Sequence, residues 1–441
     1  MSTTATLARA TFRTSRLLEY FSEKELRVQT GHDPRHWPEV VFKELTDNAL
    51  DACEEHDVLP AISVAVTPTT ITVADNGPGL APEVVQDVLD FAIRVSSRDF
   101  YVSPTRGAQG NALKTILAIP YVLSGGTPPP VTIRSRGTRH TIIVALDRIA
   151  GQPEIRHEVV EDPSVKIGTS VEVPVSTLTD GTAPRFLPLA EGYSVFNPHA
   201  SITLDLGEST PYVFARGVDA CPKWRANAPT SAWWYTPEQL RGLMRAYVNA
   251  ERDGGAARTV RDFVAEFRGL SSTVKRKAVL ADLPVAGRRL SELVTDGDID
   301  NGVVGTLLER MRAAADPVKP QALGVLGEAH LRAWLATHGG ADQTFHYRRV
   351  ADVDETTGRP FVVEVAFAGR EAGGRRRLVS GLNFAPTLAD PFRAFAGYGF
   401  GLEGLLYNLH VKSTDPVTVV VHLTTPFLHF TDRGKSSLEE L

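Results

Sequence analysis

Cysteine is scarce in this sequence: the two residues among 441, Cys53 and Cys221, stand far apart and without the spacing of metal ligands. This argues against a disulfide scaffold or a zinc knuckle and fits a reducing cytoplasm. No apolar run reaches membrane-spanning length and no signal peptide is visible, so we expect a cytoplasmic protein with no membrane partner. The twelve histidines form no H-E-x-x-H or similar arrangement, so no histidine-bound metal is predicted.

A strong net charge is also missing, because 47 Lys and Arg residues face 52 Asp and Glu residues for a formal charge of −5. That balance argues against a globally basic protein that coats DNA. It leaves open a local basic groove, with a solvated helix face as the slightly favoured alternative, for Arg258, Arg261, Lys275, Arg276 and Lys277. The length, with 42% apolar and 22% charged residues, predicts a soluble enzyme of about two to four domains.

The most informative motif is Glu44-Leu-Thr-Asp-Asn48-Ala-Leu-Asp51, whose pattern predicts a helix. The i, i+4 spacing puts Glu44 and Asn48 on one face, with Asp51 next to both. A carboxylate there can orient and deprotonate water for ATP hydrolysis, so Glu44 is the candidate base. Magnesium prefers hard oxygen ligands and keeps most of its waters, so the Asn48 amide oxygen can hold it. The motif predicts a site for ATP and Mg²⁺.

A second motif, Asp75-Asn76-Gly77-Pro78-Gly79, ends the apolar run Ile71–Val73. A buried Asp75 carboxylate can accept a hydrogen bond from the exocyclic amine of adenine. Gly77 and Gly79 are expected to take positive φ and let the backbone approach the nucleotide. Either motif alone also fits an ordinary amphipathic helix or a hairpin turn. Both in order, about 25 residues apart, make that alternative the minority one.

A glycine-bearing loop before an apolar helix over residues 112–119 is the third candidate element. Free backbone N–H groups and the helix dipole make such a loop a phosphate cradle. Its candidates for ATP contact are Thr105, Arg106, Gly107, Ala108, Gln109, Gly110 and Asn111. Lys114, one turn into the helix, is interpreted either as a phosphate ligand or as a solvated helix lysine, with neither favoured.

Both motifs and the loop resemble the GHKL ATPases, the superfamily of gyrase, heat-shock chaperone, histidine kinase and MutL. Glu44 and Asn48 match its first sequence box, and Asp75–Gly79 match its second. Ala112 stands where the superfamily usually carries a further glycine. The resemblance implies the Bergerat ATPase fold, and it implies that Thr169 places its hydroxyl near the adenine.

Patterns along the chain predict an α+β protein of three domains. Residues 1–220 alternate helix and strand patterns, which predicts an α/β sandwich with an antiparallel-rich sheet and helices on one face. Residues 221–315 carry short amphipathic helices, the first one capped by Thr236 and opened by Pro237. Residues 316–441 return to an α/β pattern, with a helix over 323–335 and strands over 361–367, 377–382 and 417–423.

Within the superfamily, the chain resembles the B subunit of DNA topoisomerase VI. The segments Glu44–Glu55 and Asn197-Pro198-His199 look like that protein, as does Asn383 followed by Pro386. The resemblance implies a helix–two-turns–helix middle domain and a C-terminal transducer domain. It also implies that Lys435 is the switch lysine, a second catalytic candidate that projects from the transducer onto the γ-phosphate.

The resemblance implies a Mg²⁺-dependent ATPase that dimerises on ATP binding and forms a gate for a DNA duplex. By the same resemblance, a separate tyrosine-bearing subunit would cleave DNA. The sequence itself shows no Toprim-like acidic cluster or winged-helix tyrosine, so we expect no strand cleavage by this chain alone. The sequence stops six residues after Lys435, where topoisomerase VI continues into a long helix, so we expect truncation or a different contact with the partner. The alternatives are a standalone GHKL clamp for DNA remodelling or defence and a MutL- or chaperone-like clamp for proteins.

Overall fold

The fold is given by a computed structural model that describes residues 20–89, 100–106, 112–147, 152–175, 182–355, 357–393, 401–426, 428, 430 and 437–438. Several residues with predicted roles lie outside the described ones: Gly107, Ala108, Gln109, Gly110, Asn111 and Lys435.

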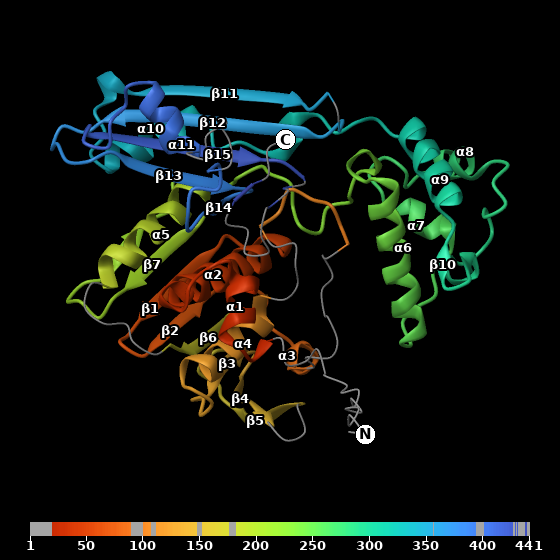
Figure 1. Cartoon of the computed structure of the whole chain (residues 1–441), viewed down its shortest axis with the longest axis horizontal. Helices are drawn as coiled ribbons and strands as arrows, with labels where there is room; N and C mark the ends of the chain where they lie inside the picture. The colour runs from red at the N-terminus through yellow and green to blue at the C-terminus, as the bar shows by residue number, and fades with distance from the viewer. Residues whose placement is uncertain are drawn as a thin grey trace, which may run out of the picture.

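The first unit, from α1 to β8, combines helices with a large mixed sheet (Figure 1). Its helices are α1 Glu23–Thr30, α2 Trp37–Glu55, α3 Pro82–Leu89, α4 Ala112–Leu123 and α5 Thr182–Phe196. Its strands are β1 Ala61–Val66, β2 Thr70–Ala74, β3 Val131–Ser135, β4 Thr138–Asp147, β5 Gln152–Glu161, β6 Thr169–Pro174, β7 Ser201–Asp205 and β8 Tyr212–Phe214. They lie in the order β5-β4-β3-β6-β2-β1-β7-β8, and β1 with β7 is the parallel pair among otherwise antiparallel neighbours.

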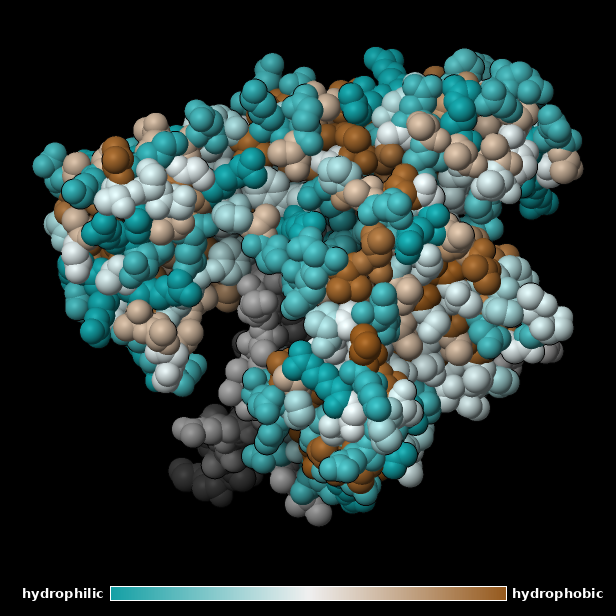
Figure 2. All heavy atoms as spheres, turned by 180° about the vertical axis from the view of Figure 1, so that it is seen from behind, coloured by the Kyte–Doolittle hydropathy of each residue, from teal (hydrophilic) through white to brown (hydrophobic). Residues whose placement is uncertain are grey.

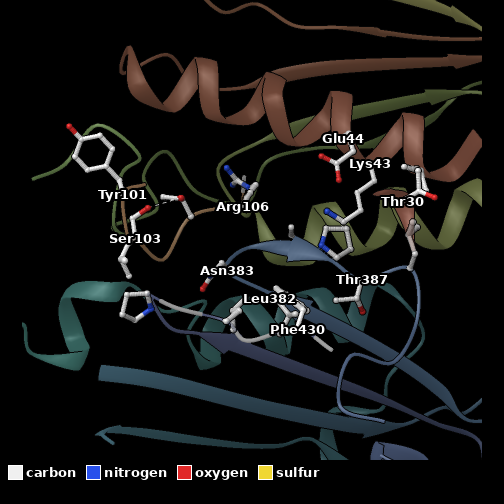
Figure 3. Close-up of a pocket in the computed structure, with 18 of the residues that line it drawn as sticks. Thr30, Lys43, Glu44, Tyr101, Ser103, Arg106, Leu382, Asn383, Thr387 and Phe430 are labelled. Carbon is white, nitrogen blue, oxygen red and sulfur yellow. Dashed lines mark hydrogen bonds between the residues drawn. The ribbon is translucent and has the colours of Figure 1, made fainter. Parts of the chain in front are cut away.

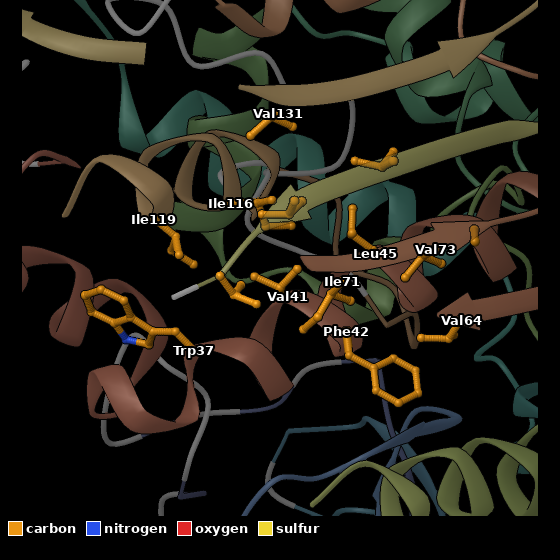
Figure 4. Packing of buried hydrophobic residues seen from close by; sticks show 14 of the residues in the cluster. Trp37, Val41, Phe42, Leu45, Val64, Ile71, Val73, Ile116, Ile119 and Val131 are labelled. Atoms are coloured by element: carbon orange, nitrogen blue, oxygen red, sulfur yellow. The ribbon is translucent and has the colours of Figure 1, made fainter. Parts of the chain in front are cut away.

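The core of this unit lies between the sheet and its helices. One side of α2 contributes Val41, Phe42 and Leu45, which are buried with the alternate residues Ile71 and Val73 of β2 (Figure 4). The helix repeat of 3.6 residues and the strand repeat of two each place apolar side chains on one face. The opposite side of α2 is thereby free to present Glu44 and Asn48.

The helical unit, from α6 to α9, has its own apolar cluster. Its elements are α6 Pro237–Arg252, α7 Val260–Ala265, α8 Thr273–Leu280, α9 Asn301–Ala314, β9 Val294–Thr295 and β10 Asp298–Ile299. Thr236 caps α6 and Pro237 opens it, as the sequence predicts, and Gln239 completes a reciprocal capping box with Thr236.

The third unit, from α10 to β15, is a second mixed sheet with helices. Its elements are α10 Glu328–Thr337, α11 Gly401–Asn408, β11 His346–Val353, β12 Pro360–Gly369, β13 Arg377–Leu382, β14 Ala385–Pro386 and β15 Val417–Thr424. The strand order is β11-β12-β15-β13-β14. Helix α5 lies between this sheet and the first one (Figure 1), and its Val195 and Phe196 belong to the third unit's apolar cluster.

Short 3-10 helices connect these elements: η2 Pro34–His36, η3 Ala232–Trp234, η4 Leu290–Leu293, η5 Pro320–Leu323 and η6 Asp342–Thr344. On the face shown in Figure 2, hydrophilic residues predominate and apolar ones form smaller groups between them. No helix in the described part of the chain is long and apolar enough to cross a membrane.

The α+β fold class is confirmed, whereas the domain boundaries at residues 220 and 315 stay predictions. One predicted helix, over residues 323–335, is wrong in its first turn. Gly324 and Gly327 have φ of 93° and 85°, so the backbone there is not helical, and α10 begins at Glu328.

Candidate functional site

Helix α2 carries the first motif, and a polar cluster between α2 and α5 holds it in place. Lys43 Nζ lies 2.5 Å from Asp47 Oδ2, and the Tyr193 hydroxyl of α5 donates to Asp47 Oδ1 at 2.8 Å and to the Lys43 carbonyl at 2.8 Å. Burial and the adjacent Asp47 carboxylate raise the pKa of Tyr193 well above its ordinary value, so the hydroxyl stays a donor. On the other side, Glu44 is half-buried and Asn48 is exposed.

Asp75 sits at the end of β2 with one carboxylate oxygen bound to the backbone. Its Oδ1 accepts from the amides of Gly77 at 2.8 Å and Thr169 at 3.3 Å. Among the described residues, none donates a hydrogen bond to Oδ2. Burial raises the pKa of Asp75, although the two amides oppose that shift. A carboxylate with one occupied and one available oxygen suits recognition of an adenine amine.

Glycines bring the second motif close to its neighbours. A Cβ atom at Gly77 would lie 2.9 Å from Asp75 Oδ1 and 3.3 Å from Cys53 Sγ of α2. Gly79 has φ of 78°, and its Cβ would lie 2.7 Å from Ser135 Oγ. The expectation of positive φ is therefore correct for Gly79 and wrong for Gly77, where close packing rather than backbone conformation demands glycine.

This turn is held together by Gly168, which precedes Thr169, and by Ser135, which the sequence did not single out. A Cβ atom at Gly168 would stand 1.8 Å from the Asp75 carbonyl oxygen, so the loop before β6 touches the motif directly. Ser135 Oγ at the end of β3 accepts from the Leu80 amide and donates to the Gly168 carbonyl, both at 2.8 Å. The Thr169 hydroxyl lies 3.3 Å from Ser135 Oγ, which places it beside the Asp75 site.

Arg106 makes buried contacts inside the protein. Its Nη1 donates to Asp51 Oδ1 at 2.7 Å and to Glu54 Oε2 at 2.9 Å, and its Nη2 donates to Glu54 Oε1 at 2.8 Å and to Asn197 Oδ1. Burial opposes the charged form, but the two carboxylates raise the pKa of Arg106 above its ordinary value. The structure thus brings Arg106 and Asp51 to each other, and their contact with ATP stays a prediction.

The remaining described candidates lie near the same loop. Thr105 Oγ1 is 2.9 Å from Ser103 Oγ. Lys114 is buried in the first turn of α4, so the interpretation as a solvated helix lysine is wrong.

A cavity of about 270 Å³ lies between the first and third units. Lys43 and Glu44 of α2 face it from one side, and Asn383 and Thr387 of the β13–β14 region face it from the other (Figure 3). Thr105, Arg106 and Phe430 also line it. The candidate base thus borders a space shared with the unit that carries Lys435.

The donor set fits magnesium better than a metal that needs several protein ligands. Within the described residues, no three His, Cys, Asp or Glu side chains are grouped to hold a metal ion. Mg²⁺ on phosphates needs only one or two protein oxygens, and the exposed Asn48 amide can supply one.

The basic cluster of the helical unit is partly neutralised. Arg258 pairs with Glu266 and lies 4.8 Å from the centre of the Tyr247 ring. Arg261 and Lys277 are exposed. Both interpretations of this cluster, DNA groove and solvated face, stay open.

Comparison with curated proteins finds B subunits of type 2 DNA topoisomerase 6. No family model matches the chain. The B subunit of type 2 DNA topoisomerase 6 from Archaeoglobus fulgidus is 25% identical over 437 residues, covering 95% of this chain and 69% of the relative. Its counterpart from Methanococcoides burtonii is 24% identical over 445 residues, covering 96% and 68%. That from Methanosarcina mazei is 30% identical over 215 residues, covering 46% and 34%.

Among solved structures, the Aquifex aeolicus MutL ATPase domain complexed with ADP aligns with a TM-score of 0.33 and 14% identity over 88% of this chain and 91% of that one. The DNA gyrase B protein from Myxococcus xanthus aligns with a TM-score of 0.40 and 13% identity over 96% and 88%.

The chain carries the α2 motif and the Asp75 turn on which the sequence resemblance to an ATPase superfamily rests. More particularly, it is similar along nearly its whole length to B subunits of type 2 DNA topoisomerase 6.

Proposed function

We propose that this chain is the ATP-binding and ATP-hydrolysing subunit of a type II DNA topoisomerase that works with a separate DNA-cleaving subunit. The observation that carries the proposal is the position of Glu44, on the helix of the first motif, at a cavity shared with the third unit. The topoisomerase 6 relatives favour this function over a standalone clamp.

The residues divide the chemistry of hydrolysis between them. Glu44 orients the attacking water and takes its proton. Asn48 supplies an amide oxygen to Mg²⁺, which when bound neutralises charge on the phosphates. The available oxygen of Asp75 accepts from the adenine amine, and the Thr169 hydroxyl lies beside it. The loop over residues 105–111 and Lys114 contact the phosphates.

Coupling to the third unit runs through the cavity. Phe430 lines it with Glu44 and pairs with Leu438 in an isolated antiparallel bridge, which supports a role for the C-terminal segment in this coupling. A lysine ammonium there would sense the γ-phosphate as a point charge. Loss of that charge contact after hydrolysis would release the third unit.

ATP then drives assembly in this proposal. Two copies dimerise through their first units when ATP binds and enclose a DNA duplex. Cleavage of a second duplex belongs to the separate DNA-cleaving partner. The chain alone is therefore an ATPase and a gate without strand cleavage.

The deciding experiment measures ATP hydrolysis by the purified chain with and without duplex DNA, and its mass with a non-hydrolysable ATP analogue. A DNA gate gives DNA-stimulated hydrolysis and an analogue-dependent dimer. The Asn48→Ala variant is the matched control and should lose both responses with its Mg²⁺–nucleotide binding. Hydrolysis that ignores DNA, with intact dimerisation, would move the assignment to a clamp acting on proteins.

A further inference from the structure

A buried polar cluster joins all three units at Arg106 through contacts that lie within the protein. We name it the junction cluster and define it as Asp51, Glu54, Arg106, Asn197 and Lys223. Glu54 is its centre, since it also lies 2.8 Å from Lys223 Nζ and 3.0 Å from His199 Nε2. Burial works against the Glu54 carboxylate, but Arg106 and Lys223 hold its pKa well below its usual range.

Sequence-distant segments meet in this cluster. Glu54 belongs to α2, Asn197 follows α5, and Lys223 precedes the helical unit. Arg106 belongs to the predicted phosphate loop over residues 105–111. The motifs Asn197-Pro198-His199 and Asn383 with Pro386, which resemble topoisomerase VI separately, also converge here.

The cluster reaches the third unit through one peptide group. The Phe384 carbonyl accepts from Arg106 Nε at 3.3 Å and from Asn197 Nδ2 at 3.0 Å. The Phe384 amide donates to His422 Nε2 of β15 at 3.1 Å. Asn383 and Phe384 have φ of 47° and 66°, a conformation that residues other than glycine rarely adopt twice in succession. Hydrogen bonds to both the carbonyl and the amide of Phe384 therefore hold the β13–β14 turn in this uncommon backbone conformation.

From His422 the contacts continue across the sheet of the third unit. His422 Nδ1 lies 3.5 Å from Glu364 Oε2 of β12, and both side chains are fully buried. Glu364 accepts from the amides of Leu326 at 2.8 Å and Gly327 at 2.9 Å, at the start of α10. A continuous series of buried polar contacts thus runs from α2 to α10.

The segment before Arg106 is anchored in the helical unit. The Val102 amide donates to the Tyr235 hydroxyl at 2.9 Å, and the Thr230 hydroxyl donates to the Val102 carbonyl at 2.8 Å. Tyr101 hydrogen-bonds to Tyr247 and donates to Glu266. The chain that leads into Arg106 is thus fixed on the helical unit.

We propose that Arg106 is a positioning residue that couples helix α2, which carries the first ATP motif, to the third unit through the Phe384 carbonyl, so that nucleotide binding and the β13–β14 turn are energetically linked. Buried ion clusters tolerate few arrangements, because each carboxylate left without its partner is costly. The cluster can therefore transmit a discrete change rather than absorb it. The inference rests on the proposed ATP binding.

The test is amide hydrogen exchange of peptides that cover residues 377–386 and 417–424, with and without a non-hydrolysable ATP analogue whose affinity is measured in parallel. The main variant is Arg106→Lys, which keeps the charge beside Asp51 and Glu54 but lacks the planar fork that reaches several partners at once. The matched control is Arg185→Lys. Arg185 forms an equivalent two-armed pair with Glu39 at the other end of α2, at 2.7 and 2.6 Å.

A second variant keeps the test decisive even where Arg106→Lys does not fold. Asn197→Asp has nearly the same shape and still accepts from Arg106, but it cannot donate to the Phe384 carbonyl. Coupling between sites commonly amounts to about 5- to 150-fold in affinity. We expect the analogue to slow exchange in wild type and Arg185→Lys, and this effect to fall by at least about fivefold in both junction variants.

Each outcome decides one point. An undiminished exchange response in Asn197→Asp, or in a folded Arg106→Lys, would overturn the proposal and leave the cluster with a structural role only. No response in wild type that binds the analogue would overturn it as well. No binding of the analogue by wild type would instead refute the proposed ATPase function, on which the coupling depends.

Discussion

At the residue scale, the Asp75 carboxylate has one oxygen bound to backbone amides and one oxygen available for the proposed adenine contact. Oδ1 accepts from the Gly77 and Thr169 amides, which fixes the plane of the carboxylate. The position of Oδ2 is thereby fixed by the hydrogen-bonded turn, because the side chain keeps little freedom to rotate. This preorganisation lowers the entropy cost of binding a nucleobase.

The proposed adenine contact of Asp75 predicts how ATP affinity responds to a substitution and to pH. Asp75→Asn replaces one acceptor by an amide, and hydrogen bonds to charged groups are worth about 1.5–3 kcal/mol, so ATP affinity should fall about 10- to 150-fold. Because burial raises the pKa of Asp75, the carboxylate takes up a proton at a higher pH than an ordinary Asp. ATP affinity should therefore weaken as the pH falls through that raised pKa, as titration calorimetry can measure.

Asp75→Asn should lose this component of the pH dependence as well as affinity. The matched control is Asp205→Asn, since Asp205 is exposed at the end of β7 and its Oδ1 accepts from the Gly207 amide. Equal ATP affinity in Asp75→Asn and wild type would remove Asp75 from adenine recognition.

The proposed role of Glu44 as general base predicts that its replacement lowers the rate of ATP hydrolysis and leaves ATP binding intact. Glu44→Gln keeps the size of the side chain but removes the base, and general-base catalysis contributes about 10²- to 10⁴-fold. We expect ATP binding close to wild type and a turnover number lower by about that factor. Steady-state hydrolysis and equilibrium nucleotide binding measure the two quantities. Glu55→Gln, on the last turn of the same helix, is the control, and normal turnover in Glu44→Gln would assign the base elsewhere.

The sequence reveals the local part of this site but not its distant partners. Glu44, Asn48 and Asp75 stand out because short spacings in the chain fix their relation. Ser135 and Gly168 could not be found in this way, since their role exists only where β3, β6 and the Asp75 turn meet. The partners of Arg106 likewise come from segments about 50 and 90 residues away in the chain, and no local pattern encodes such contacts.

At the element scale, the sequence predicts amphipathic elements best. Strand β13 spans the predicted residues 377–382, and β15 ends one residue beyond the predicted range 417–423. The sequence pattern does not reveal helix α5, because it packs between two sheets and is apolar on several sides: Phe186, Leu189, Ala190, Tyr193, Val195 and Phe196 are all buried. A helix without a polar face lacks the stripe on which periodicity depends, and Pro188 within it adds a misleading breaker signal.

Replacing Gly168, in the loop before β6, by alanine is expected to cost more stability than the same change at a glycine in open space. Gly168→Ala adds a methyl group 1.8 Å from the Asp75 carbonyl, which forces the Asp75 turn to move. Gly137→Ala is the matched control, since Gly137 has a similar positive φ but nothing within 4 Å of its added Cβ. The control should cost about 1–2 kcal/mol of unfolding free energy for its backbone conformation alone.

Gly168→Ala should cost clearly more than the control and should also weaken ATP binding. Urea unfolding monitored by circular dichroism measures the first quantity, and nucleotide titration measures the second. Equal losses in both variants would mean that the contact between Gly168 and the Asp75 turn is unimportant for the site.

At the scale of the whole molecule, two routes connect the first and third units. One is the cavity that Glu44 and Phe430 share, and the other is the junction cluster around Arg106. Arg106 also lines the cavity, so the two routes meet at this residue. They differ in the proposal, because only the contact of Lys435 would depend on the γ-phosphate.

Lys435 tests the cavity route, because its proposed contact exists only while the γ-phosphate is in place. Lys435→Ala should bind ATP nearly normally and hydrolyse it about 100-fold more slowly, the usual effect of removing one donor to developing charge. Lys435→Arg should recover part of the rate because it retains the charge. Lys412→Ala, an exposed lysine of the third unit, is the control. If Lys435→Ala hydrolyses ATP at the wild-type rate, Lys435 is not the switch, and the junction cluster remains the connection between nucleotide and third unit.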